Sequence, residues 1–149
     1  MTKGSVVHAA VRALDTIGSA ITHDEASTHI VTGRMGEEAA YFHLRKLGYV
    51  IVARNWRVPQ CKGELDLVGW DGDVLCFVEV KTRSTHDVKP AEAAVDDKKR
   101  RELALMAGHF LRRLGGAKSP THRFDIVSIY FSQDKPAEIT LFKNVCAVP

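Results

Sequence analysis

A chain of 149 residues is long enough to bury one substantial core and fits a single domain. Its 45% hydrophobic and 26% charged residues are ordinary for a globular protein, and no run is long enough for a transmembrane helix. The lack of such a run predicts no membrane partner. Three widely separated cysteines, Cys61, Cys76 and Cys146, argue against a disulfide framework or a zinc site and favour a cytoplasmic location. The net charge of +3, with basic residues bunched between Lys98 and Arg123, is compatible with either a phosphate-bearing partner or a solvated helix surface.

The first part of the chain is predicted to lie outside the main domain. Residues 1–31 form an N-terminal extension in this interpretation, and the main domain spans residues 32–149. Apolar residues at helical spacing favour a short helix over residues 6–20. The polar stretch Thr22–Thr32 favours a linker.

The main domain is predicted to alternate between helices and strands. The expected elements, in chain order, are a helix over residues 34–48 that ends at Gly48, a strand over 49–57, two strands joined by a turn at Asp71-Gly72, a helix from a cap at Asp96 or Asp97 to Leu114, and strands over 123–131 and 138–144. This order predicts the α/β class, with an αβββαβ core in which a mixed sheet is flanked by helices. The strand after the turn is apolar on both alternating sets of residues, which is typical of a central strand covered on both faces.

Charged residues interrupt the two strands on either side of the turn. Glu64 and Asp66 lie in the first strand, and Glu79 and Lys81 lie in the second. Because side chains alternate between faces, a two-residue turn at Asp71-Gly72 places all four charges on one face, with Glu64 opposite Glu79. Burying unpaired carboxylates is costly. The pattern therefore predicts either a bound divalent cation, Mg²⁺ or Mn²⁺, or an ion-pair network with Lys or Arg of a neighbouring element.

The spacing of these charges carries a family resemblance. Asp66, followed after twelve intervening residues by Glu79-Val80-Lys81, resembles the PD-(D/E)XK signature of restriction-endonuclease-like nucleases, and the expected order of elements is similar to the core of that superfamily. More closely, "GRMGEEAA", "GELDLV", "FVEVKTR" and "RFDIV" resemble the YraN-type family of uncharacterised bacterial proteins, over roughly Gly33 to Phe142. Leu65 stands where the signature has a proline.

The resemblance implies roles for individual residues. Asp66, Glu79 and the backbone carbonyl of Val80 would bind Mg²⁺ or Mn²⁺, and Lys81 would orient or deprotonate the attacking water. The implied enzyme is a Mg²⁺-dependent endonuclease that hydrolyses phosphodiester bonds in DNA, including branched or damaged DNA. Glu37 shares a helix face with apolar residues. It is either an added catalytic ligand, as in Holliday-junction-resolvase-like members, or a first-turn acid that interacts with the helix dipole.

Three basic residues are candidates for contact with nucleic acid. Lys99 continues the apolar face of the second long helix, and we expect it to reach a substrate phosphate or the acidic site; the alternative is a helix-end lysine that extends its charge into solvent. Arg83 follows the strand of Lys81, and Arg123 opens the fourth strand. Asp125 is expected to form a structural ion pair with a neighbouring basic residue.

Three interpretations of function follow from the sequence. The preferred one is a metal-dependent nuclease. The first alternative is a nucleic-acid-binding accessory protein with little or no cleavage activity, and the second is a structural protein whose acidic cluster is only an ion-pair network. The sequence leaves open the choice between DNA and RNA, the preferred substrate structure, and whether the chain forms a homodimer.

Overall fold

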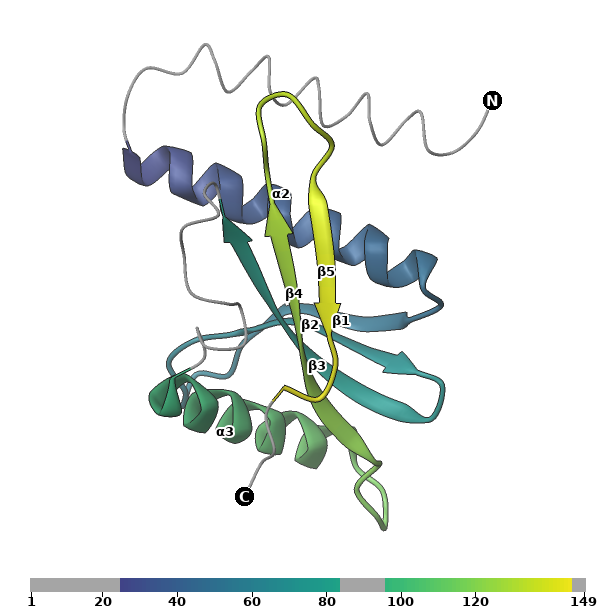
Figure 1. The fold of residues 1–149 in the computed structure, drawn as a ribbon. Helices are drawn as coiled ribbons and strands as arrows, with labels where there is room; N and C mark the ends of the chain where they lie inside the picture. The colour runs from purple at the N-terminus through teal and green to yellow at the C-terminus, as the bar shows by residue number, and fades with distance from the viewer. Residues whose placement is uncertain (1–24, 84–95, 146–149) are drawn as a thin grey trace. The chain divides into compact units, whose positions relative to one another are not determined.

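The computed structural model describes residues 25–83 and 96–145. The described part consists of two helices, α2 (Glu25–Lys46) and α3 (Asp97–Leu114), and five strands, β1 (Val50–Trp56), β2 (Leu65–Asp71), β3 (Val74–Arg83), β4 (His122–Tyr130) and β5 (Glu138–Phe142) (Figure 1). The chain divides into two compact units, Met1–Met35 and Gly36–Pro149. The predicted helix over residues 6–20 lies outside the described residues, and the predicted domain boundary at residue 32 stays a prediction.

Helix α2 begins earlier than the sequence pattern predicted. It starts at Glu25, so residues 25–32 are helical, and the linker predicted there is wrong for these residues. The stretch has no apolar stripe that would predict a helix. It also contains no proline, and its polar residues do not prevent a helix from forming. The other end agrees with the prediction, because Gly48 lies just beyond the helix with a φ of 93°, a conformation that glycine adopts without strain.

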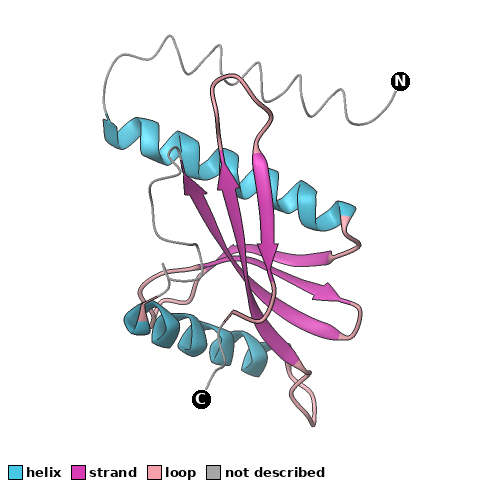
Figure 2. Cartoon of the chain, in the orientation of Figure 1, coloured by secondary structure: helices cyan, strands magenta, loops and turns pink. Residues whose placement is uncertain are grey.

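The five strands form one mixed sheet in the order β1-β2-β3-β4-β5. Strands β3 and β4 are parallel, and the other neighbouring pairs are antiparallel. Strand β3 is therefore central, as its apolar pattern predicted. The fold class and the αβββαβ order of the core are confirmed (Figure 2). Helix α3 also begins as predicted, with Asp96 as its N-cap accepting a hydrogen bond from the Lys99 N–H over 2.8 Å.

Two apolar clusters cover the two faces of the central strand. On one face, Leu75 and Phe77 pack against α3; on the other, Cys76 and Val78 pack against the C-terminal half of α2. The α3 side includes Leu103, Met106, Ala107, Phe124 and Ile126, and the α2 side includes Ala40, Leu44, Val127 and Ile129. Each large apolar side chain buried in this way contributes roughly 1.5–3 kcal/mol. The central strand is therefore a rigid support for any polar group that it carries.

The hairpin between β2 and β3 turns one residue later than predicted. Asp71 pairs with Val74, so the two turn residues are Gly72 and Asp73. Gly72 has a φ of 60°, and Asp73 is not among the described residues with positive φ. This is the pattern of a type II′ turn, which has glycine at its first central position, whereas the prediction had placed the glycine second.

The change of turn shifts the register by two residues. The predicted pairing of Glu64 with Glu79 is wrong. Continuing the observed pairing of Leu67 with Val78 by one step places Asp66 directly opposite Glu79. Because the shift is an even number of residues, the predicted face of each side chain is unchanged. The residue opposite Glu79 is therefore Asp66 and not Glu64.

A glycine allows α2 to pass very close to the central strand. A Cβ atom at Gly36 would lie 1.9 Å from Oγ1 of Thr82, a distance that no pair of unbonded atoms can adopt. The absence of a side chain at this position allows α2, and with it Glu37, to approach the sheet closely. Among the described residues, no helix has the length and apolar character needed to cross a membrane.

Candidate metal centre

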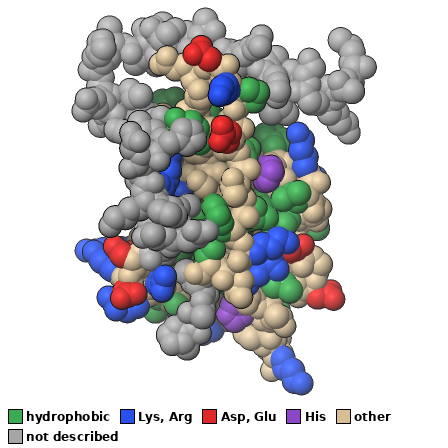
Figure 3. Space-filling view, in the orientation of Figure 1, with side chains coloured by type: hydrophobic (Ala, Val, Ile, Leu, Met, Phe, Trp, Pro, Cys, Tyr) green, Lys and Arg blue, Asp and Glu red, His purple; other side chains and the backbone are tan. Residues whose placement is uncertain are grey.

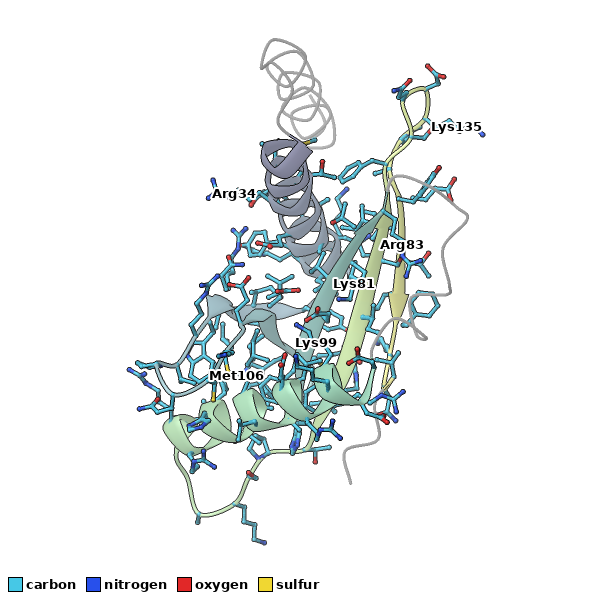
Figure 4. All side chains as sticks on the ribbon, turned by 90° about the vertical axis from the view of Figure 1, so that its left-hand side faces the viewer. Arg34, Lys81, Arg83, Lys99, Met106 and Lys135 are labelled. Carbon is cyan, nitrogen blue, oxygen red and sulfur yellow. The ribbon has the colours of Figure 1, made fainter. Side chains whose placement is uncertain are left out.

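Glu79 is a buried carboxylate on the central strand, with an exposed fraction of 5%. Nζ of Lys81 lies 2.8 Å from its Oε1, and Nζ of Lys99 lies 3.2 Å from the same oxygen. Figure 4 shows the two lysines beside each other, one from β3 and one from α3. The other oxygen, Oε2, is buried and has no hydrogen-bond partner within the described part of the chain. An unsatisfied buried acceptor costs about 1–3 kcal/mol or more when charged, so this oxygen favours a cationic ligand.

Asp66 faces Glu79 from the neighbouring strand. Its Oδ2 accepts a hydrogen bond from the main-chain N–H of Val80 over 2.7 Å. Burial and the negative charge of Glu79 raise the pKa of Asp66 to about 7, although the bond from Val80 and the charge of Lys99 act in the opposite direction. Two facing carboxylates with too few donors are a typical environment for a hard cation.

Glu37 and Glu64 extend the acidic centre. A carboxylate oxygen of each lies within 4.8 Å of the others and of an oxygen of Asp66. The three acids come from three segments, because Glu37 belongs to α2, Glu64 precedes β2, and Asp66 lies within β2. The structure thus places Glu37 at the cluster. Glu64 was not singled out as a site residue, although its spacing of two from Asp66 predicts a shared face.

Two side chains, one near the end of β1 and one just after it, hold the outer acids. Nδ2 of Asn55 donates a hydrogen bond of 2.8 Å to Oε2 of Glu37. The guanidinium of Arg57 lies 2.6 Å from Oε2 of Glu64. The predicted ion-pair alternative is therefore realised for Glu64. No pattern in the sequence had pointed to Asn55 or Arg57, because their contacts span 18 and 7 residues and depend on how the chain folds back on itself.

Two of the predicted basic residues lie at the same centre or next to it. Lys99 reaches the acidic site, as its position on the apolar helix face predicted. Arg83 lies at the end of β3, two residues beyond Lys81, so both project from the same face of the strand (Figure 4).

Arg123 lies elsewhere in the fold. It pairs in register with Cys76, an odd number of residues from Glu79, so it projects from the opposite face of the sheet. Its guanidinium donates to Asp125 over 2.9 Å, to the hydroxyl of Tyr49 over 2.9 Å, and to Asp71. The predicted structural ion pair of Asp125 is confirmed. The structure does not bring Arg123 to the acidic centre.

Fold and site together define a class: an α/β protein whose central strand carries a buried glutamate held by two lysines. Residues 36–129 match the model of a family described as "Uncharacterised protein family UPF0102", and the chain belongs to this family. The resemblance to YraN-type proteins is thereby confirmed. Its relatives include UPF0102 proteins of three bacteria. That of Koribacter versatilis is 53% identical over 135 residues, which cover 91% of this chain and 90% of the relative. That of Solibacter usitatus is 50% identical over 97 residues (65% and 73%), and that of Caldicellulosiruptor saccharolyticus is 39% identical over 114 residues (75% and 93%).

Proposed function

We propose that this protein is a metal-dependent nuclease of the restriction-endonuclease-like superfamily, which hydrolyses phosphodiester bonds in DNA and prefers branched or damaged DNA. The observation that carries the proposal is the state of Glu79. One of its oxygens is held by two lysines, and the other is buried with no hydrogen-bond partner among the described residues, on a residue that lies opposite Asp66 in the sheet. The order of elements and the Asp66 and Glu79-Val80-Lys81 pattern support the same function.

The donor set fits a hard divalent cation. Carboxylates of Asp66 and Glu79 and the main-chain carbonyl of Val80 are oxygen ligands, which Mg²⁺ and Mn²⁺ prefer. Among the described residues, Arg57 pairs with Glu64, and Lys81 and Lys99 pair with Glu79. Glu37 and Asp66 accept hydrogen bonds from neutral donors, the Asn55 amide and the Val80 N–H, so their charges are left for a cation. A bound cation would neutralise charge on the phosphate and lower the pKa of a water molecule.

The two lysines can perform different tasks because they share one oxygen of Glu79. One ammonium can keep Glu79 in place while the other turns to the substrate. Lys81 projects from the same strand as Glu79, and we assign it to the attacking water, which it orients and whose proton it relays. Lys99 approaches from α3, and we assign it to the negative charge that develops on the phosphate oxygens.

We expect the binding of DNA to be weak and salt-sensitive. On the face in Figure 3, Lys and Arg side chains lie among Asp and Glu side chains and do not gather into one large basic patch. Lys99 and Arg83 are the phosphate contacts in this proposal, and Arg123 has only a structural role.

The described cysteines, Cys61 and Cys76, are both free, in keeping with the proposed cytoplasmic location.

The test combines metal binding with cleavage. We expect Mn²⁺ or Mg²⁺ to raise the melting temperature of the wild-type protein through binding to the folded state, and Asp66→Asn with Glu79→Gln to abolish that rise. We also expect metal-dependent nicking of branched DNA, which Lys81→Ala should reduce about 10²–10⁴-fold. The control is Lys135→Ala, an exposed loop residue, purified in parallel.

Each outcome of the test separates the alternatives. Metal binding without cleavage favours the accessory protein. Absence of any metal response favours a structural acidic cluster. Equal cleavage by all variants indicates a contaminating nuclease and removes the support for an enzyme.

A further inference from the structure

Asn55 has a backbone conformation that few residue types adopt. It is the penultimate residue of β1 and has a φ of 46°, in the left-handed region. Non-glycine residues rarely occupy this region, and asparagine is enriched among those that do. The following residue, Trp56, packs against Phe110 with ring centroids 5.2 Å apart, which fixes the end of the strand against the α3 side. A strained conformation held in place by a well-packed neighbour points to a function for the strained residue.

The side chain of Asn55 is directed at the acidic centre. Its Nδ2 donates to Oε2 of Glu37 over 2.8 Å, and Glu37 is one of the three acids whose oxygens lie within 4.8 Å of one another. An amide is a neutral donor. It fixes the direction of the Glu37 carboxylate and leaves its negative charge intact, whereas Arg57 cancels the charge of the acid it holds.

We propose that Asn55 is a positioning residue that holds Glu37 toward Asp66 as an additional carboxylate of the metal centre, a role that rests on the proposed function. The position has two requirements, a left-handed backbone and a neutral donor. Glycine meets only the first, and aspartate would place a further negative charge against the cluster. Asparagine meets both.

A neighbouring contact provides a matched control. Arg54, also on β1, donates to Glu38, the residue after Glu37 on α2, over 2.6 Å. Both members of this pair are more than a third exposed, and Glu38 is not a member of the acidic cluster. Arg54→Gln therefore removes a contact between the same two elements without touching the proposed metal centre.

The experiment uses the full chain and compares Asn55→Gly with Arg54→Gln. Affinity for Mn²⁺ alone is measured by calorimetric titration, and the melting temperature is measured in the absence of metal. Because glycine adopts the φ of Asn55 without strain, Asn55→Gly separates loss of the donor from backbone effects. We expect Asn55→Gly to weaken Mn²⁺ binding about 10–100-fold, the usual loss when a residue that orients a metal ligand is removed. Arg54→Gln should leave the Mn²⁺ affinity unchanged.

A third measurement distinguishes positioning from a merely structural contact. If Asn55 acts through Glu37, then adding Asn55→Gly to Glu37→Gln should cause no further loss of Mn²⁺ affinity. Additive losses, or wild-type affinity in Asn55→Gly, would overturn the inference. If the wild-type protein binds no Mn²⁺, the proposed function and this inference are both overturned. If Asp66→Asn with Glu79→Gln abolishes Mn²⁺ binding but Asn55→Gly does not change it, only the inference is overturned.

Discussion

The main-chain N–H of Val80 donates a hydrogen bond of 2.7 Å to Oδ2 of Asp66. This bond joins β2 to β3 where two carboxylates face each other, and it favours the ionised form of Asp66. Burial and the charge of Glu79 outweigh it, so the pKa of Asp66 rises to about 7. The carboxylate is thus held in place by a donor but is costly to ionise, a combination typical of a functional acid.

We expect Asp66→Asn to stabilise the metal-free protein at alkaline pH. The pKa of Asp66 is higher in the folded protein than in the unfolded chain. Its protonated form therefore contributes fully to stability below about pH 4, and this contribution is lost as the pH rises through about 7. Asparagine keeps an acceptor for the Val80 N–H and carries no charge. At pH 8 in EDTA the variant should gain roughly 1–4 kcal/mol in free energy of unfolding, measured with urea.

The control for this prediction is Asp73→Asn, at an exposed position of the β2–β3 turn. It should not reproduce the gain. At pH 4 the stabilities of Asp66→Asn and wild type should converge. A loss of stability in Asp66→Asn at pH 8 would show that the ionised carboxylate is satisfied in the metal-free fold.

Lys99 and Arg83 should contribute to the salt dependence of DNA binding. Each phosphate contact that is removed lowers the slope of log affinity against log salt concentration by about one. We therefore expect Lys99→Ala and Arg83→Ala to weaken binding of branched DNA and to flatten this slope, measured by fluorescence anisotropy with Ca²⁺ in place of Mg²⁺. Lys135→Ala should leave both quantities unchanged. If both variants keep the wild-type slope of log affinity against log salt concentration, Lys99 and Arg83 do not contact the phosphate backbone.

The elements and the acidic face were predictable because they depend on local patterns. The apolar residues on both faces identified the central strand, Asp96 and Leu114 marked the ends of α3, and helical spacing placed Lys99 toward the acidic site. The family resemblance pointed to Glu79, because the Glu79-Val80-Lys81 motif is contiguous in the sequence.

Other features were not predictable because they depend on choices that local patterns leave open. The Asp-Gly pair in the β2–β3 turn fits two turn types, and the two types differ in register by two residues. The contact of Asn55 with Glu37 joins residues 18 positions apart, so it emerges only when α2 is packed beside β1. The polar start of α2 gave no helix signal because no apolar stripe marks it.

The Asp71 network should stabilise the fold without affecting the metal centre. Hydrogen bonds from Arg123 and Lys143 lower the pKa of Asp71 to about 2. Its contribution to stability is therefore present above about pH 4 and lost as pH falls through about 2. We expect Asp71→Asn to lower the melting temperature at pH 7, with the difference from wild type disappearing near pH 2. The Mn²⁺-induced rise in melting temperature should persist in the variant, since Arg123 projects from the face opposite to Glu79.

Because α2 lies so close to β3 at Gly36, we expect Gly36→Ala to lower the stability of the protein, the opposite of the usual effect in a helix. Alanine normally stabilises a helix by about 1 kcal/mol relative to glycine. At Gly36 the new Cβ would lie 1.9 Å from Oγ1 and 3.1 Å from Cβ of Thr82, so either the Thr82 side chain turns to another rotamer or the helix moves away from the strand. We expect Gly36→Ala to destabilise the protein by about 1–3 kcal/mol in urea unfolding and to weaken Mn²⁺ binding, because Glu37 moves with the helix.

Gly108→Ala in α3 is the matched control, because its Cβ would meet only Nη1 of Arg112 at 3.6 Å, and it should be neutral or stabilising. Adding Thr82→Ala to Gly36→Ala removes the clashing oxygen and should restore much of the stability. Stability in Gly36→Ala equal to that of wild type would show that the helix does not need this close contact.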